Sequence, residues 1–286
     1  IFSLFLIVLS TCPVGAATYY VKNGGNDSAA GTSSAPWATI AKVAATATSG
    51  DTVYFDNEST WSGTLPVLTA RAGITYNGSS WGMGTRAKLL CTNQNNTSGI
   101  ILISGSNSNV KGFEVTASNG TYATNGINIC SHCGVNVSNV TIDNMLVHDI
   151  GGTQCQPVYG WGAIGRGIYV GTFMGNTISN VTITNNEVYN INYGGIVVYP
   201  AWNASQTDRV QNVTIRGNTV HDTGRAGGTG CYADDHHGDG IYIKDDADDI
   251  IIEYNHIYAN PFHGINVECS NDEPAETDPQ AITVRY

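Results

Sequence analysis

The stretch Asn180-Val-Thr-Ile-Thr-Asn-Asn-Glu-Val188 recurs as Asn212-Val-Thr-Ile-Arg-Gly-Asn-Thr-Val220, with an apolar residue returning at the same offset. Further copies begin at Asn139 and Asp249. A second motif, a glycine followed by apolar residues, alternates with the first and begins at Gly99, Gly126, Gly167, Gly195, Gly240 and Gly264. Two motifs that alternate along a chain indicate a structural repeat.

The spacing of the second motif predicts coils of a solenoid. Its glycines lie 27, 41, 28, 45 and 24 residues apart. The short intervals suit one coil, and the long ones suit a coil with an inserted loop of about 15 to 20 residues. Stacked coils about 4.8 Å apart bury their apolar sides and pair each backbone with the next. The repeat therefore predicts a parallel β-helix, whereas the regular hairpin signals of a β-sandwich and the leucines of a leucine-rich repeat are missing.

Strand alternation also predicts which side chains share a column. Ile241 and Ile243 face one side of their strand, and Tyr242 and Lys244 face the other. We expect inward asparagines at one turn, where an earlier coil has Met145, and packing rather than catalysis at a corner occupied by His and Tyr. The expected columns are Tyr199, Lys244 and Glu268; Tyr169, Val197, Tyr242 and Asn266; Asn186, Asn218 and Asn255; and His148, Tyr189, His221 and Tyr258.

The composition points to an exported protein of one domain. Ile1–Ala16 reads as a signal peptide, too short to span a bilayer, so we expect a secreted, extracellular or periplasmic protein without a membrane span in the mature chain. The net charge of −11 argues against nucleic acid as a partner. Six cysteines follow the signal peptide, and we expect disulfides among them, with a zinc site at Cys130 and Cys133 as the alternative.

The N-terminal part carries a family resemblance. The segments Tyr19 to Asp27, Gly31 to Lys42 and Gly50 to Phe55 resemble the opening of the pectate lyase-like superfamily. The resemblance implies an all-β, single-stranded right-handed parallel β-helix with an N-terminal capping helix, expected from Pro36 to about Thr48. It divides the chain into a signal peptide (1–16), a strand with the capping helix (17–50) and β-helix coils (51–286), which we expect to continue beyond Tyr286.

The two inserted loops are expected to form the walls of a groove, whose floor is the outer face of the strands that follow the glycines. The loops place Arg166, Trp202 and Arg225 next to this face, where aromatic residues could stack on sugar rings or anchor the loops. The densest cluster of titratable groups lies between Tyr232 and Glu268. We expect substrate-binding roles for Arg166, Tyr169, Tyr199, Trp202, Arg225, His263, Asn266 and Glu268.

Removal of a proton next to a carboxylate needs a base and a cation that offsets the carboxylate charge. Tyr232-x-x-Asp235-x-His237 and His263-Gly-x-Asn266-Val resemble motifs of alginate C5-epimerases. We therefore expect a polysaccharide lyase or C5-epimerase acting on an extracellular polymer of uronic acids. The expected catalytic residues are Tyr232, Asp235, His237, Asp239, Tyr242 and Lys244.

Calcium is a second source of positive charge for such a substrate. Asp234, Asp235 and Asp239 are the candidate ligands. The alternatives are a glycoside hydrolase that resembles polygalacturonases and uses paired carboxylates, and a monomeric β-helix that binds carbohydrate or serves as a surface protein without catalysis. A local titratable cluster favours an enzyme, and we expect a monomer in either case.

Overall fold

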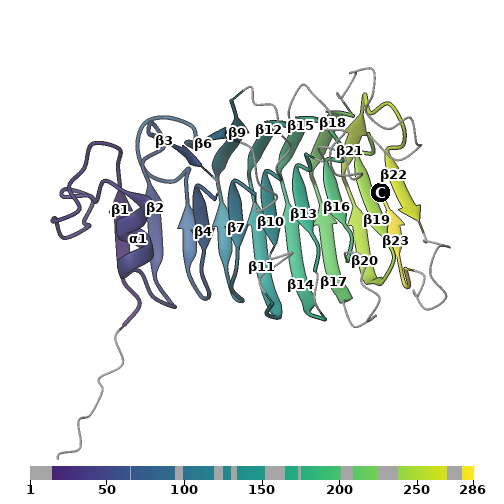
Figure 1. Ribbon diagram of the computed structural model, residues 1–286, viewed down its shortest axis with the longest axis horizontal. Helices are drawn as coiled ribbons and strands as arrows, with labels where there is room; N and C mark the ends of the chain where they lie inside the picture. The colour runs from purple at the N-terminus through teal and green to yellow at the C-terminus, as the bar shows by residue number, and fades with distance from the viewer. Residues whose placement is uncertain are drawn as a thin grey trace, which may run out of the picture.

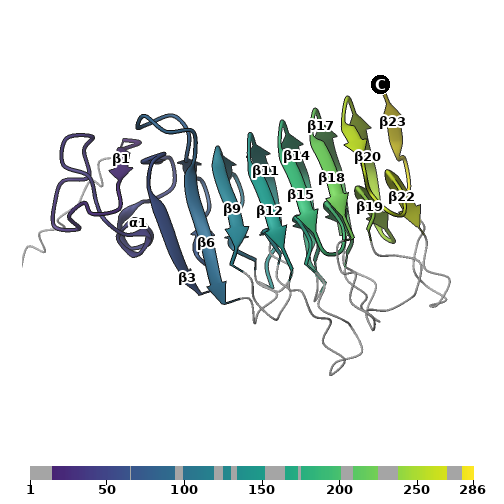
Figure 2. The ribbon, with the colours of Figure 1, turned by 90° about the horizontal axis from the view of Figure 1, so that it is seen from above.

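Three parallel β-sheets run along the whole molecule, which is a right-handed parallel β-helix (Figure 1). The computed structural model describes residues 15–64, 66–93, 99–118, 125–129, 134–151, 165–172, 175–200, 209–224, 238–268 and 279–286. Each coil contributes one strand to each sheet in turn, and every strand pairs with its equivalent one coil further on. Figure 2 shows the coils following one another along the long axis.

Sheet 1 has nine strands and sheets 2 and 3 have seven each. Sheet 1 contains β1 (Thr18–Val21), β2 (Thr52–Phe55), β5 (Thr75–Asn77), β8 (Asn109–Lys111), β11 (Val137–Asp143), β14 (Thr177–Thr184), β17 (Arg209–Arg216), β20 (Ala247–Glu253) and β23 (Thr283–Arg285). Sheet 2 contains β3 (Thr60–Thr64), β6 (Ala87–Asn93), β9 (Phe113–Ala117), β12 (Leu146–Ile150), β15 (Glu187–Ile191), β18 (Thr219–Thr223) and β21 (His256–Tyr258). Sheet 3 contains β4 (Leu68–Ala70), β7 (Ile101–Ile103), β10 (Ile127–Ile129), β13 (Ile168–Val170), β16 (Ile196–Val198), β19 (Ile241–Lys244) and β22 (Ile265–Glu268).

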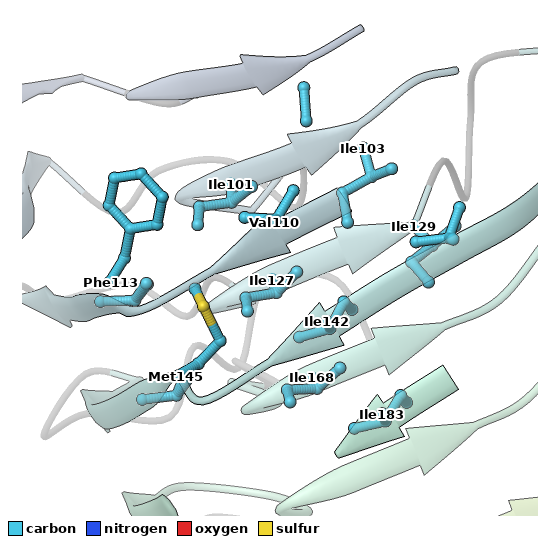
Figure 3. Close-up of a cluster of buried hydrophobic side chains, with 14 of the residues drawn as sticks. Ile101, Ile103, Val110, Phe113, Ile127, Ile129, Ile142, Met145, Ile168 and Ile183 are labelled. Atoms are coloured by element: carbon cyan, nitrogen blue, oxygen red, sulfur yellow. The ribbon is translucent and has the colours of Figure 1, made fainter. Parts of the chain in front are cut away.

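The core lies between the three sheets and consists of stacked aliphatic residues. Ile101, Ile127 and Ile168 occupy equivalent positions in successive strands of sheet 3 and are fully buried. Figure 3 shows these side chains turned toward Ile142 and Ile183 of sheet 1. Equivalent positions of successive coils therefore carry similar residues, and this similarity produces the repeat seen in the sequence.

Close approach of the backbone explains the glycine that leads each strand of sheet 3. A Cβ on Gly195 would lie 2.3 Å from the Val220 side chain and 2.7 Å from the carbonyl oxygen of Gly240. A Cβ on Gly240 would meet Ile257 and the carbonyl oxygen of Gly264 at 2.4 and 2.7 Å. Only glycine lets the chain turn from sheet 2 into sheet 3 at this packing distance.

The Asn-Val-Thr-Ile motif has a different origin. The sheet 1 strands begin before this asparagine, which adopts a left-handed conformation within the strand, with φ of 57° at Asn139, 54° at Asn180 and 56° at Asn212. Asn and Asp tolerate this region better than other residues that carry a Cβ. The motif therefore marks a bend inside each strand of sheet 1 rather than the start of the strand.

The predicted asparagine ladder is confirmed at the turn between sheets 1 and 2. The amide oxygen of Asn218 accepts from the backbone N–H and the side-chain amide of Asn186, at 3.0 and 2.9 Å. Asn255 accepts in the same way from Asn218. Met145 begins the series by donating its backbone N–H to Asn186 over 2.8 Å.

The helix at the N-terminal end is shorter than predicted. Helix α1 spans Ile40–Thr46 and begins after Thr39, whose side chain accepts from the N–H of Lys42. Trp37 cannot join the helix because its backbone pairs with Val21 of β1. Val43 and Ala47 are buried with the first coils, so the helix covers this end of the core (Figure 1).

Cys91 is a thiol buried in β6. The other five cysteines for which disulfides are predicted lie outside the described residues, so the disulfide prediction stays a prediction. No helix in the described part of the chain is both long and apolar enough to cross a membrane.

Candidate functional site on the outer face of sheet 3

The two predicted outward columns on sheet 3 are present. Tyr169 pairs with Val197, Val197 with Tyr242, and Tyr242 with Asn266. In the neighbouring column Lys244 pairs with Glu268, and the ammonium of Lys244 lies 5.4 Å from the centre of the Tyr199 ring.

Between β10 and β19 the outer face of sheet 3 is largely buried, unlike the outer face of sheet 1. Tyr169, Val197 and Tyr242 are at most 4% exposed and form an apolar cluster separate from the core, with Tyr193 and Tyr199 packed against it. In sheet 1, by contrast, inward residues are buried and outward ones are half-buried or exposed. The outward side chains in this part of sheet 3 are therefore shielded from solvent, whereas those of sheet 1 are not.

A carboxylate, a cation and a phenol meet at the end of β19 and β22. The hydroxyl of Tyr242 donates to Oε2 of Glu268 over 2.8 Å, and Nζ of Lys244 lies 3.6 Å from Oε1 of the same carboxylate. The side chains of Lys244 and Glu268 are 18% and 23% exposed, so solvent reaches this pair from one side. Burial, with additional effects of Tyr193 and Glu268, raises the pKa of Tyr242 far above its usual range, and this phenol stays protonated.

Arg166 precedes β13 and rests on aromatic rings. Its guanidinium carbon lies 4.3 Å from the centre of the Tyr169 ring and 5.3 Å from that of Tyr193. Its Nε is buried and makes no hydrogen bond to any residue that the structure describes. A cation held over ring faces with an unused donor is suited to a carboxylate ligand.

A second phenol, that of Tyr193, lies close to both Arg166 and Tyr242. Burial raises the pKa of Tyr193 to about 12, and the negative charges of Asp239 and Glu268 add to this shift while Arg166 opposes it. Its ring lies 6.2 Å from that of Tyr242. Tyr193 was not among the predicted site residues, because it precedes Gly195 and lies outside both repeat motifs. It stands two residues before that glycine, close to the positions that Arg166 and Asp239 occupy before the glycines of neighbouring coils, and this position could have indicated that it belongs to the site.

Asp239, His263 and Asn266 form a hydrogen-bonded group at the beginning of the same two strands. Oδ1 of Asp239 lies 2.9 Å from Nδ1 of His263 and accepts from its backbone N–H at 3.1 Å. Oδ2 accepts from the side-chain amide of Asn266 at 3.1 Å. Asp239 is 1% exposed, whereas the His263 side chain is 55% exposed.

The structure thus brings together nine predicted site residues on one face, namely Arg166, Tyr169, Tyr199, Asp239, Tyr242, Lys244, His263, Asn266 and Glu268. Six further predicted residues lie outside the described residues: Trp202, Arg225, Tyr232, Asp234, Asp235 and His237. Their roles stay predictions.

The calcium prediction is not tested by the described residues. They contain no group of three or more His, Cys, Asp and Glu placed to hold a metal ion. Both oxygens of Asp239 are occupied by hydrogen bonds from His263 and Asn266. Calcium ligation by Asp234, Asp235 and Asp239 remains untested, since two of the three lie outside the described residues.

The His and Tyr column predicted to be structural lies on sheet 2, away from this site. The rings of His148, Tyr189, His221 and Tyr258 stack one above another with centres 5.0, 5.1 and 4.7 Å apart. Nδ1 of His148 pairs with Asp149 and that of His221 with Asp222. These contacts support the packing role.

Comparison with solved structures supports the fold. The lacto-N-biosidase of family GH136 from Eubacterium ramulus superposes with a TM-score of 0.61 at 14% identity, over 94% of this chain and 55% of that one. A pectate lyase, Pel9A, superposes with a TM-score of 0.50 at 12% identity, over 95% and 78% of the two chains. The Dettilon tailspike protein gives 0.52 at 18% identity, over 92% and 48%.

The chain spans about half the length of the lacto-N-biosidase. No protein-family model and no curated protein sequence matches it. At these identities the likeness establishes the right-handed parallel β-helix and nothing finer.

Proposed function

We propose that the outer face of sheet 3 binds a polysaccharide containing uronic acids and that the protein acts on it as a lyase or C5-epimerase. The observation that carries this proposal is the placement of Arg166 and Lys244 against tyrosine rings on one face, in a chain whose net charge is −11. A neutral glycan would have no use for two cations there. A polyanion needs them, because the rest of the chain repels it.

The aromatic surroundings make these cations selective for carboxylates. Arg166 lies over Tyr169 and Tyr193, where water is scarce and the attraction between unlike charges is stronger than in bulk solvent. Its planar guanidinium can donate two parallel hydrogen bonds to one carboxylate. The half-buried rings of Tyr193 and Tyr199 also provide apolar surface for a sugar ring.

The same face supplies groups for proton transfer. Removing the proton on carbon 5 of a uronate places negative charge on the adjacent carboxylate, and a cation at that carboxylate stabilises the charge. Burial raises the pKa of Tyr242 far above its usual range, so its hydroxyl keeps its hydrogen and donates it in a hydrogen bond to Glu268. The side chain of Glu268 accepts a hydrogen bond from Tyr242 and lies 3.6 Å from the ammonium of Lys244.

One observation favours a second candidate, hydrolysis by paired carboxylates. Asp239 precedes β19 and Glu268 ends β22, so two carboxylates lie at opposite ends of one pair of strands. One would protonate the departing oxygen and the other would activate water. The two reactions leave different products.

The test uses the purified chain with alginate, pectate, other uronic acid polymers and neutral glycans. A lyase gives unsaturated ends that absorb in the ultraviolet, and an epimerase changes uronate stereochemistry without cleavage. Reducing ends without ultraviolet absorption would replace the proposal with the hydrolase. Absence of both turnover and binding for every uronic acid polymer would overturn it.

Variants locate the binding face. Arg166→Gln and Lys244→Met are expected to weaken binding of a uronate oligosaccharide by about tenfold or more, the worth of a charge-assisted hydrogen bond. Arg216→Gln is the matched control, because Arg216 pairs with Glu253 at 3.2 Å on sheet 1. Equal loss in the control and the two site variants, measured by calorimetry, would show that net charge rather than this face governs binding.

A further inference from the structure

The hydrogen bonds around Asp239 determine which nitrogen of His263 is available. Asp239 is almost fully buried, and its carboxylate accepts from the backbone N–H of His263 and from the amide of Asn266. A carboxylate flanked by donors is an acceptor for its remaining contact, Nδ1 of His263 at 2.9 Å. The neutral imidazole therefore carries its hydrogen on Nδ1, and Nε2 bears the lone pair.

The other ring nitrogen, Nε2, belongs to a side chain that is largely exposed to solvent. The His263 side chain is 55% exposed, and within the described part of the chain its Nε2 makes no hydrogen bond. His263 precedes β22, and it shares the Asp239 carboxylate with Asn266, which pairs with Tyr242, so the imidazole lies near the beginning of the column that also carries the buried phenol. The His221 side chain in the ring stack of sheet 2, by contrast, is only 13% exposed.

The backbone fixes this arrangement. The N–H of Gly240 donates to the carbonyl of His263 over 2.9 Å, which places Asp239 beside His263 across the two coils. Gly238 adopts φ of 123°, and a Cβ there would lie 2.6 Å from Pro261 and 2.9 Å from Phe262. A backbone hydrogen bond and the close approach of Gly238 to the Pro261 and Phe262 side chains thus hold the segment that carries Asp239 against the segment that carries His263.

We infer that His263 is the general base of the proposed reaction, and that Asp239 and Asn266 are its positioning residues. This inference rests on the proposed function and assigns a role within it. Nε2 takes the proton from carbon 5 of the uronate, and the electron pair of the broken C–H bond passes into the adjacent carboxylate. The imidazolium formed is stabilised by Asp239, because the bond from Nδ1 then joins two opposite charges.

The first test is the tautomer, which does not depend on activity. Nuclear magnetic resonance of protein labelled at histidine should show the Nδ1–H form for the signal that disappears in His263→Gln. Asp239→Asn, whose amide can donate as well as accept, should raise the share of the Nε2–H form. A wild-type His263 found mainly as the Nε2–H tautomer would overturn the inference.

The second test is kinetic. His263→Gln is expected to lower kcat by about 100-fold or more with little change in KM, as loss of a general base does. Asp239→Asn is expected to lower kcat by about tenfold or more and to alter the shape of the pH profile. His221→Gln is the matched control, because His221 has the same pairing with an aspartate, 2.7 Å to Asp222, on the other face. Circular dichroism checks that each variant keeps its fold.

The outcomes separate the two proposals. An active wild type whose His263→Gln variant keeps its kcat overturns the base assignment alone. A wild type that turns over no uronic acid polymer overturns the proposed function and the base assignment together. An equal loss in His221→Gln and His263→Gln would mean that both act through the fold, which also overturns the assignment.

Discussion

The hydroxyl of Tyr242 and the ammonium of Lys244 reach the same carboxylate from the preceding coil, at 2.8 Å to Oε2 and 3.6 Å to Oε1 of Glu268. Glu268 is therefore held from both sides by residues two positions apart on β19. Two adjacent columns of the solenoid become connected through this one side chain.

Tyr242→Phe removes one of these contacts without creating a large cavity. The hydrogen bond joins a buried phenol to a carboxylate, so its loss should lower the free energy of unfolding by about 1 to 2 kcal/mol. Tyr258→Phe is the control, because the Tyr258 hydroxyl makes no hydrogen bond to the described residues and its ring is 44% exposed. Urea denaturation measures both. A shift no larger in Tyr242→Phe than in Tyr258→Phe would show that the contact contributes nothing.

The raised pKa of Tyr193 predicts a loss of stability in alkali. The usual value is 10.0 and the folded value is about 12, so between these pH values the unfolded chain releases a proton that the folded protein retains. Stability from this group is complete below pH 10 and falls as the pH rises toward 12. Tyr193→Phe should remove that part of the fall, and its urea midpoint should gain on the wild type over this range. Parallel curves for the two proteins would contradict the shift.

Much of the fold and of the site columns could be predicted from the sequence, because the repeat fixes both. Once Gly195 and Gly240 are aligned, the neighbours of Val197 and Tyr199 follow from counting residues along each strand. The bend at Asn180 could not be predicted this way, since an asparagine inside a strand and one before it give the same spacing. The beginning of α1 was misplaced because Trp37 pairs with β1, a contact that the local pattern does not contain.

The details of the site depended on side chains outside the repeat. Arg166 could be predicted as a ligand candidate, but not its position over Tyr193, because Tyr193 belongs to neither motif. The contact between Asp239 and His263 depends on side-chain rotation next to two glycines, and period-two alternation does not determine that rotation. The repeat predicts which column a residue occupies, whereas the chemistry depends on how the side chain turns within it.

Asn218→Ala tests the asparagine ladder. The change removes the acceptor of two Asn186 N–H groups and the donor to the carbonyl of Ile183, all inside the coil. Unpaired buried polar groups of this kind should lower the free energy of unfolding by about 3 kcal/mol in total. Thr219→Ala, one residue further and facing outward, should cost about 1 kcal/mol or less. Equal shifts of the urea midpoint would mean that water satisfies the groups left behind.

The ring stack on sheet 2 contains Tyr189, and substitution of this residue should lower stability without lowering activity. Tyr189 lies between His148 and His221, at 5.0 and 5.1 Å with interplanar angles of 5° and 3°. Tyr189→Ala removes both contacts, and stacked pairs contribute about 0.5 to 1.5 kcal/mol each, so the free energy of unfolding should fall by about 1 to 3 kcal/mol. Activity on the uronic acid substrate should stay within about twofold at a temperature where the variant remains folded, because the stack lies on a different sheet from Tyr242 and His263. Tyr189→Phe, which keeps the ring, should retain both stability and activity. A folded Tyr189→Ala protein that loses activity would place sheet 2, rather than sheet 3, in contact with the substrate.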